Sequence, residues 1–228
     1  MPQPPWILDT CRSAMAQAPD EKVGTTADVA RELMILVYKD RLVEAGHVDL
    51  PPCLSASHVN GGDKHNQLAR VMVGMCRQVR SQYESKFADM IGQMSFTART
   101  GYGQFLTFAS ELFQAGVTHG KIVSLYVFCA ELANSCMNNP ASLGAHYVAS
   151  LMSWQLRCFK ETVDSWLIKQ GGWSSFEKVF APKVVGLDNI TPGHLPCADP
   201  EDRKPEVWRS RMAGMAVMTL GLAYVLGS

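Results

Sequence analysis

ELFQAGVTHGKIVSLYVFCAEL, residues 111–132, joins the end of one amphipathic helix to a second helix that is apolar on every side. Gly116 is typical of a helix C-terminus, and Thr118 is a good N-cap for the helix that follows. A helix that is apolar all round belongs in the middle of a bundle or in a membrane. We therefore expect a tight helix junction with one cation, Lys121, leading into a buried central helix.

The composition indicates one domain and argues against several function classes. The 228 residues are 47% hydrophobic with zero net charge, so charge does not recruit nucleic acid or an anionic bilayer over the whole surface. The seven cysteines are scattered singly, which favours reduced thiols over disulfides or zinc. No nucleophile motif, phosphate loop or metal-ligand spacing occurs. We expect no enzyme activity, no catalytic residue, no metal, no cofactor, no nucleic-acid partner and no small-molecule substrate.

The apolar residues divide the chain into four segments. Residues 1–27 are expected to be a disordered lead, and residues 28–181 a bundle that begins at an Asp28 cap. Residues 182–211 read as a Pro-rich linker. Residues 212–228 are uncharged and follow a basic flank. A helix over 212–227 would span about 24 Å, short of the roughly 30 Å hydrocarbon core, but its position favours a membrane tail anchor over a last core helix.

The predicted fold class is all-α, a helical bundle around a central buried apolar helix with a C-terminal tail-anchor helix. Apolar residues recur at three- and four-residue steps, and no strand-like alternation of useful length appears. Helices are expected over 28–46, 65–94 with a second short turn beyond it, 103–114, the segment after Lys121, 141–170 as one helix or two in line, and 173–180. Residues 47–63 have the composition of a loop.

Two motifs resemble the Bcl family of apoptosis regulators. Residues 111–128 are similar to the family's first homology motif: Val117, Gly120, Ile122 and Val123 match, while Thr118, His119 and Lys121 replace Asn, Trp and Arg. DSWLIKQGGWSSFEKVF, residues 164–180, is similar to the second motif through Trp166, Gly171, Gly172, Trp173 and Phe176. Residues 31–46 resemble the family's N-terminal homology helix, and residues 83–90 the segment after the death motif. Residues 221–224 are similar to the myeloid cell leukaemia member and THGKIVSLY to the ovarian killer member, so the subgroup stays open.

The third motif departs from the family pattern. Where the family has Leu-x-x-x-Gly-Asp, one register gives Met72, Cys76 and Arg77, and the other puts Met75 in place of Asp. In the family this Asp pairs with the Arg of the first motif when a death helix occupies another chain's groove. Lys121 can still accept a partner's Asp, as a point charge without the bidentate fork of Arg.

The resemblance implies a groove that binds the death-motif helices of pro-apoptotic Bcl family proteins. Carried over position by position, the pocket walls are Val79, Tyr83, Phe87, Met90, Phe108, Leu112, Val123 and Phe128. Lys121 is the charge partner, with Thr118 and Gly120 at the rim and Glu111 near it. For the apolar residues, ordinary core packing is the alternative interpretation.

The first hypothesis is a prosurvival regulator anchored through its C-terminal helix. The expected place is the mitochondrial outer membrane, with the endoplasmic reticulum as the alternative, facing the cytosol and with a cytosolic pool. The second hypothesis is a pro-apoptotic pore former of the same family. The missing acid at Arg77 argues against it, because a killer needs its own death helix to be a good ligand. A helical scaffold without a groove is the third.

Overall fold

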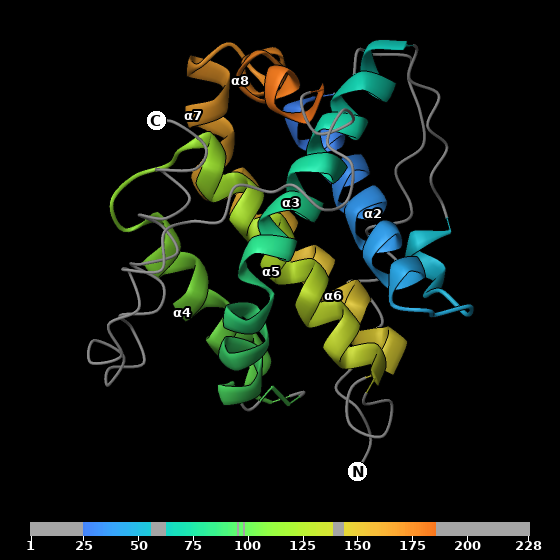
Figure 1. Cartoon of the computed structure of the whole chain (residues 1–228). Helices are drawn as coiled ribbons and strands as arrows, with labels where there is room; N and C mark the ends of the chain where they lie inside the picture. The colour runs from blue at the N-terminus through green and yellow to red at the C-terminus, as the bar shows by residue number, and fades with distance from the viewer. Residues whose placement is uncertain (1–24, 56–62, 95, 98, 139–143, 186–228) are drawn as a thin grey trace, which may run out of the picture.

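The helix that follows the junction, α5 (His119–Asn138), runs through the centre of the molecule in the computed structural model (Figure 1). The structure describes residues 25–55, 63–94, 96–97, 99–138 and 144–185. Around α5 lie α2 (Thr26–Glu44), α3 (Asp63–Gln93), α4 (Gly101–Phe113), α6 (Gly144–Cys158), α7 (Asp164–Lys169) and α8 (Trp173–Val185), with a 3-10 turn η1 (Pro52–Leu54) and a π-helical turn η2 (Phe159–Val163). In these residues every regular element is helical, which confirms the all-α prediction.

Burial of α5 on all sides confirms the prediction of a central helix. It contacts α2, α3, α4 and α6, and its run from Gly120 to Ala130 is buried without interruption. Two buried tyrosine hydroxyls in this core are paired: the Tyr126 hydroxyl donates to the Ala30 carbonyl at 2.9 Å, and the Tyr38 hydroxyl donates to Gln155 Oε1 at 2.7 Å. These bonds hold α5 and α6 to α2, and they satisfy both hydroxyl groups.

Helix α2 begins earlier than the sequence pattern predicts. The N-cap is Thr25, whose side chain accepts from the Asp28 N–H, while the Asp28 carboxylate accepts from the Thr25 N–H at 2.9 Å. This reciprocal arrangement is a capping box. The prediction that Asp28 caps the helix was therefore wrong, because Asp28 is the third residue of the helix and closes the box from inside.

Helix α3 is one long element with a kink. Its backbone is helical from Asp63 to Gln93 except at Tyr83, where φ is −124° and ψ is 21°. The predicted helix over 65–94 is thus confirmed, and the 3-10 turn η1 interrupts the expected loop before it. Residues on both sides of the kink, Val79 and Phe87 among them, belong to the same hydrophobic core.

The C-terminal part of the bundle runs α6, η2, α7 and α8. The first three form a continuous helical stretch that ends at Gly171 and Gly172, as predicted. Helix α8 continues through Pro182 to Val185, so the first residues of the predicted 182–211 linker are helical, contrary to expectation. Packing explains this difference, because α8 lies on α3, where Gly74 leaves room for Val184: a Cβ on Gly74 would lie 2.9 Å from Val184 Cγ1.

The predicted lead up to residue 24, most of the predicted linker and the tail anchor over 212–228 lie outside the described residues. Within the described part, no helix combines the length and the apolar character that a membrane span needs. The tail anchor therefore stays a prediction from the sequence.

Candidate functional site

The junction between α4 and α5 has the geometry that the sequence predicts. Gly116 has a φ of +91°, a left-handed conformation that glycine adopts without strain, and its N–H donates to the Phe113 carbonyl at 2.9 Å. The Thr118 hydroxyl accepts from the Lys121 backbone N–H at 3.3 Å, which caps the start of α5. The junction folds the Lys121 side chain back toward the chain segment that leaves α4.

Lys121 is a buried cation, with only 5% of its surface exposed. Its Nζ donates to the Gly116 carbonyl at 2.7 Å, and burial lowers the pKa of the ammonium. Among the described residues, no carboxylate forms an ion pair with it. A Lys ammonium has three donors, of which Gly116 takes one. The site is thus a positioned cation to which the described part of the chain offers no acidic partner.

Glu111, near the end of α4, is not paired with Lys121. Its Oε1 atom is buried and has no hydrogen-bond donor among the described residues, and burial raises the pKa of this carboxyl. A buried acceptor without a partner costs about 1–3 kcal/mol. The two ends of this junction therefore hold a donor group and an acceptor group that do not satisfy each other.

The predicted pocket walls come from three helices and meet in one hydrophobic core. Val79, Tyr83, Phe87 and Met90 lie on α3, Phe108 and Leu112 on α4, and Val123 and Phe128 on α5. Phe108 and Phe128 stack with ring centroids 3.6 Å apart. Except for Met90, these residues are buried, and the most exposed of them, Tyr83, shows 7% of its surface. The side chains are packed against one another, so a partner helix would reach them only after the surrounding helices part.

The rim residues differ in exposure. Thr118 is exposed, while Gly120 is buried inside the first turn of α5. His119, which stands in place of the family's Trp, lies against Trp166, Phe176 and Phe180, with ring centroids 4.9–6.3 Å away. The imidazole therefore fills an aromatic position between α5, α7 and α8.

A hydrogen bond to Ser175 makes Nε2 of His119 a donor. The Ser175 hydroxyl donates to the Gly172 carbonyl at 2.7 Å, so its oxygen accepts from His119 Nε2–H across 3.1 Å. Burial lowers the pKa of His119. A neutral ring also suits its place at the start of α5, where the helix dipole disfavours a cation.

Sequence reasoning missed a set of ion pairs that hold α2 to α3 and α5. Arg77, which one of the two registers puts at the position of the family's Asp, donates to Asp40 through Nε at 3.0 Å and Nη2 at 2.5 Å. Four further side chains continue the set: Arg80 pairs with Glu44, and Arg41 makes a bidentate pair with Glu131 at 2.5 and 3.0 Å. The spacing of the two acids on α2 and of the two arginines on α3 was the available signal, since residues three or four apart share a helix face.

Comparisons with known proteins agree with this fold. Residues 72–173 match the family model described as apoptosis regulator proteins, Bcl-2 family. The chain is 29% identical to the apoptosis regulator Bcl-2 of Cricetulus griseus over 46% of this chain and 44% of that one. It is also 29% identical to the Bcl-2 of Canis lupus familiaris, over 64% of this chain and 54% of the relative. The chain thus spans about half the length of these curated relatives.

A solved structure has the same fold. It is the crystal structure of Trichoplax adhaerens trBcl-2L2 bound to trBak BH3. The match includes 68% of this chain and 99% of the solved chain. The TM-score is 0.61 at 22% sequence identity. Family model and sequence relatives point the same way: residues 72–173 are similar to the Bcl-2 family of apoptosis regulators, and the fold agrees.

Proposed function

We propose that this protein is a prosurvival regulator that binds the death-motif helices of pro-apoptotic relatives in a groove between α3, α4 and α5. Lys121 carries the proposal: it is a buried cation at the family's Arg position, and no described carboxylate pairs with it. A partner's Asp would take the donors that Gly116 leaves open. The fold neighbour from Trichoplax adhaerens, which was crystallised with trBak BH3, supports this mode of binding.

Binding requires the groove to open. Phe87, Phe108 and Phe128 are each 1% exposed or less, so their rings are available to a partner only after α3 and α4 separate. Only molecules in the open state can bind. The apparent Kd therefore equals the Kd of the open state divided by the fraction of molecules that are open. The kink at Tyr83 is the natural place for this motion, because the backbone there already leaves the helical conformation.

The state of the chain's own third motif supports the prosurvival reading. Arg77 stands where a death helix needs an acid, and it is held by Asp40 of α2. To enter another groove, this part of α3 would lose that pair and would then present a cation to the cation of the partner site. Like charges at close range repel, which disfavours a killer role.

We further propose that residues 212–228 anchor the protein in an organelle membrane. The mitochondrial outer membrane is the first choice and the endoplasmic reticulum the second, with the bundle facing the cytosol. An uncharged run behind Arg203, Lys204, Arg209 and Arg211 supports the proposal, since basic flanks stay on the cytosolic side.

A double-mutant cycle on Lys121 tests the groove. The trBak BH3 peptide and its Asp→Asn form are titrated against the wild type, Lys121→Met and the control Lys160→Met, which removes an exposed cation from η2. We expect the Asp→Asn change to weaken binding to the wild type and to the control by about tenfold or more, and to have little effect with Lys121→Met. Equal losses in all three proteins would rule out Lys121 as the partner of the acid.

A release assay tests the sign of action. The protein is added to mitochondria that lack endogenous killers, and cytochrome release is measured with and without added killer protein. We expect no release from the protein alone and reduced release when a killer is present. Release by the protein alone would contradict the prosurvival role. If the peptide titration described above also shows no binding of a death-motif peptide, a scaffold without a groove is favoured.

A further inference from the structure

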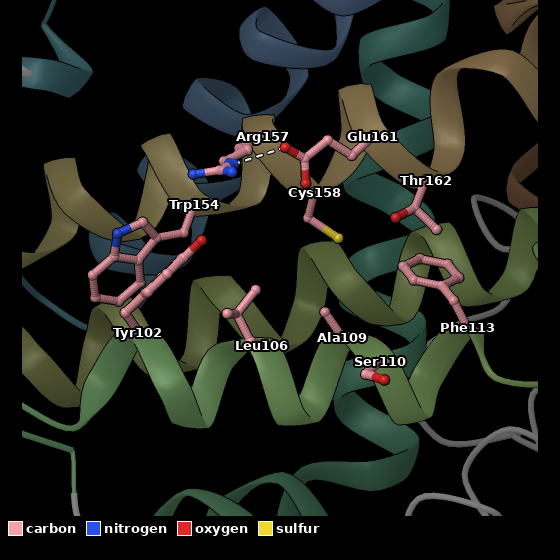
Figure 2. Close-up of a pocket in the computed structure, with 10 residues that line it drawn as sticks. All are labelled: Tyr102, Leu106, Ala109, Ser110, Phe113, Trp154, Arg157, Cys158, Glu161 and Thr162. Carbon is pink, nitrogen blue, oxygen red and sulfur yellow. Dashed lines mark hydrogen bonds and ion pairs between the residues drawn. The ribbon is translucent and has the colours of Figure 1, made fainter.

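A pocket separate from the proposed groove lies between α4 and α6. Its volume is about 360 Å³, within the usual range of small-molecule sites. Figure 2 shows one wall made by α4, with Leu106 and Ala109 directed into the space, and the other wall made by α6 and η2, with Trp154 and Cys158 above them. The opposite face of α4, with Phe108, packs on α5, so the pocket uses side chains that the groove does not.

The floor and one end of the pocket are apolar. Leu106 is 44% exposed and Tyr102 36%, which places two large apolar groups in contact with water over a cavity. Trp154 forms a rigid aromatic end, with its ring centroid 5.4 Å from Tyr102 and 5.3 Å from Tyr147. Covering such surface with an apolar ligand is favourable by about 25 cal/mol per Å².

Arg157 places a cation with several N–H donors at the mouth of the pocket. Arg157 donates from Nε to Glu161 Oε1 at 2.8 Å, and no other acceptor contacts it among the described residues. A guanidinium has five N–H donors in a planar fork, so four are open to a ligand. The Tyr102 hydroxyl lies on the same side of the pocket in Figure 2. A cationic ligand would instead have to compete with Arg157 for Glu161.

We propose that this pocket binds a small amphiphile that has a carboxylate head and a single apolar tail. The head binds the free edge of the Arg157 guanidinium, and the tail runs along α4 from Leu106 toward Phe113, which is about 10 Å of helix and matches a medium-length acyl chain. A carboxylate fits because its two oxygens match two parallel N–H donors of the fork. The proposal does not depend on the peptide groove.

Titration calorimetry with decanoate and with decan-1-ol, below their aggregation limits, tests the site in the full chain. Ala109→Phe fills the pocket from α4, and its control Thr107→Phe adds the same ring at an exposed position outside the pocket. Arg157→Gln removes the head contact, and its control Lys160→Gln removes a neighbouring exposed cation.

We expect saturable 1:1 binding of decanoate to the wild type and to both controls. Arg157→Gln should weaken decanoate about tenfold while leaving decan-1-ol unchanged, and Ala109→Phe should weaken both ligands. Undiminished binding to Ala109→Phe, with its helical circular dichroism unchanged, would place the ligand elsewhere and overturn the proposal. Failure of wild-type protein to bind decanoate would also overturn it, as would equal effects of Arg157→Gln on both ligands.

Discussion

At Gly101, the first residue of α4, the backbone lies directly against the Tyr147 side chain of α6. A Cβ there would lie 1.2 Å from Tyr147 Oη and 2.6 Å from its Cζ. The Tyr147 ring cannot move freely, because it is 7% exposed, packs edge-on against Trp154 and donates to the Thr97 carbonyl at 3.3 Å. Only glycine fits between the start of α4 and this ring.

Gly101→Ala is therefore expected to lower the free energy of unfolding by about 1–3 kcal/mol, the usual effect of overpacking. The matched control is Gly103→Ala in the same helix, where a Cβ would meet nothing within 4 Å. That change should raise stability by about 0.5–1 kcal/mol, because alanine is the better helix former. Urea unfolding of both variants measures the difference, and equal effects would contradict the packing account.

At the scale of elements, α2 is held to α3 and α5 by charge as well as by apolar contact. Glu131 of α5 lies between Arg41 and Arg80, and the side chains of all three are exposed by only 13–16%. Ion pairs that are largely withdrawn from water depend on every partner, since removing one leaves the others unpaired.

Glu131→Gln should lower the free energy of unfolding by about 2 kcal/mol, because Arg41 and Arg80 both lose a charged acceptor. The control is Glu161→Gln, which breaks the exposed pair with Arg157 and should cost less than about 1 kcal/mol. Urea denaturation at low and high salt measures both. Equal losses in the two variants would show that the burial of Glu131 is not what matters.

His119 links the start of α5 to α7 and α8 in a pH-dependent way. Since burial lowers its pKa in the folded state, the unfolded chain binds the proton more readily. Its contribution to stability is complete above the unfolded value of about 6.5 and is lost as the pH falls through that value toward the folded pKa. Acid should therefore loosen the packing of His119 on Trp166 and Phe176.

His119→Phe keeps the aromatic contact but removes the titrating group. Stability of the wild type should fall more between pH 7.5 and pH 5 than that of the variant, as measured by denaturant unfolding at both values. The other histidines are present in both proteins, so the difference between the two slopes isolates His119. A steeper loss in the variant would reverse the sign and refute the interpretation.

At the scale of the whole molecule, the bundle and the C-terminal apolar run are separate in the sequence. Deleting residues 212–228 should leave the thermal unfolding of the helices and the binding of death-motif peptide unchanged. The same deletion should move the protein from the membrane fraction of cells to the soluble fraction, because the uncharged run is removed. Fractionation with a Leu220→Arg variant as a second test checks this, and unaltered membrane association of both would refute the anchor.

Local patterns in the sequence determined much of this protein. The three- and four-residue spacing of apolar residues is a property of each helix alone, so α3, α4 and α5 were predicted close to their observed places. Gly116 and Thr118 act on the backbone next to them, and their roles in the junction were readable for the same reason. The prediction that Asp28 is the N-cap was wrong, because Asp28 is the inner residue of a capping box. Helix α8 continues beyond Pro182 because it packs on α3.

The tertiary structure alone decided how the faces of those helices meet. Periodicity marks a side chain as apolar without saying whether it lines an open groove or fills a core, and the structure packs Phe108 against Phe128. The ion pair between Arg77 and Asp40 joins residues that are distant along the chain. The pocket beside Arg157 is likewise lined by residues of different helices. Helix formation depends on neighbours within about four residues, whereas burial, ion pairing and cavity shape depend on the packing of whole elements.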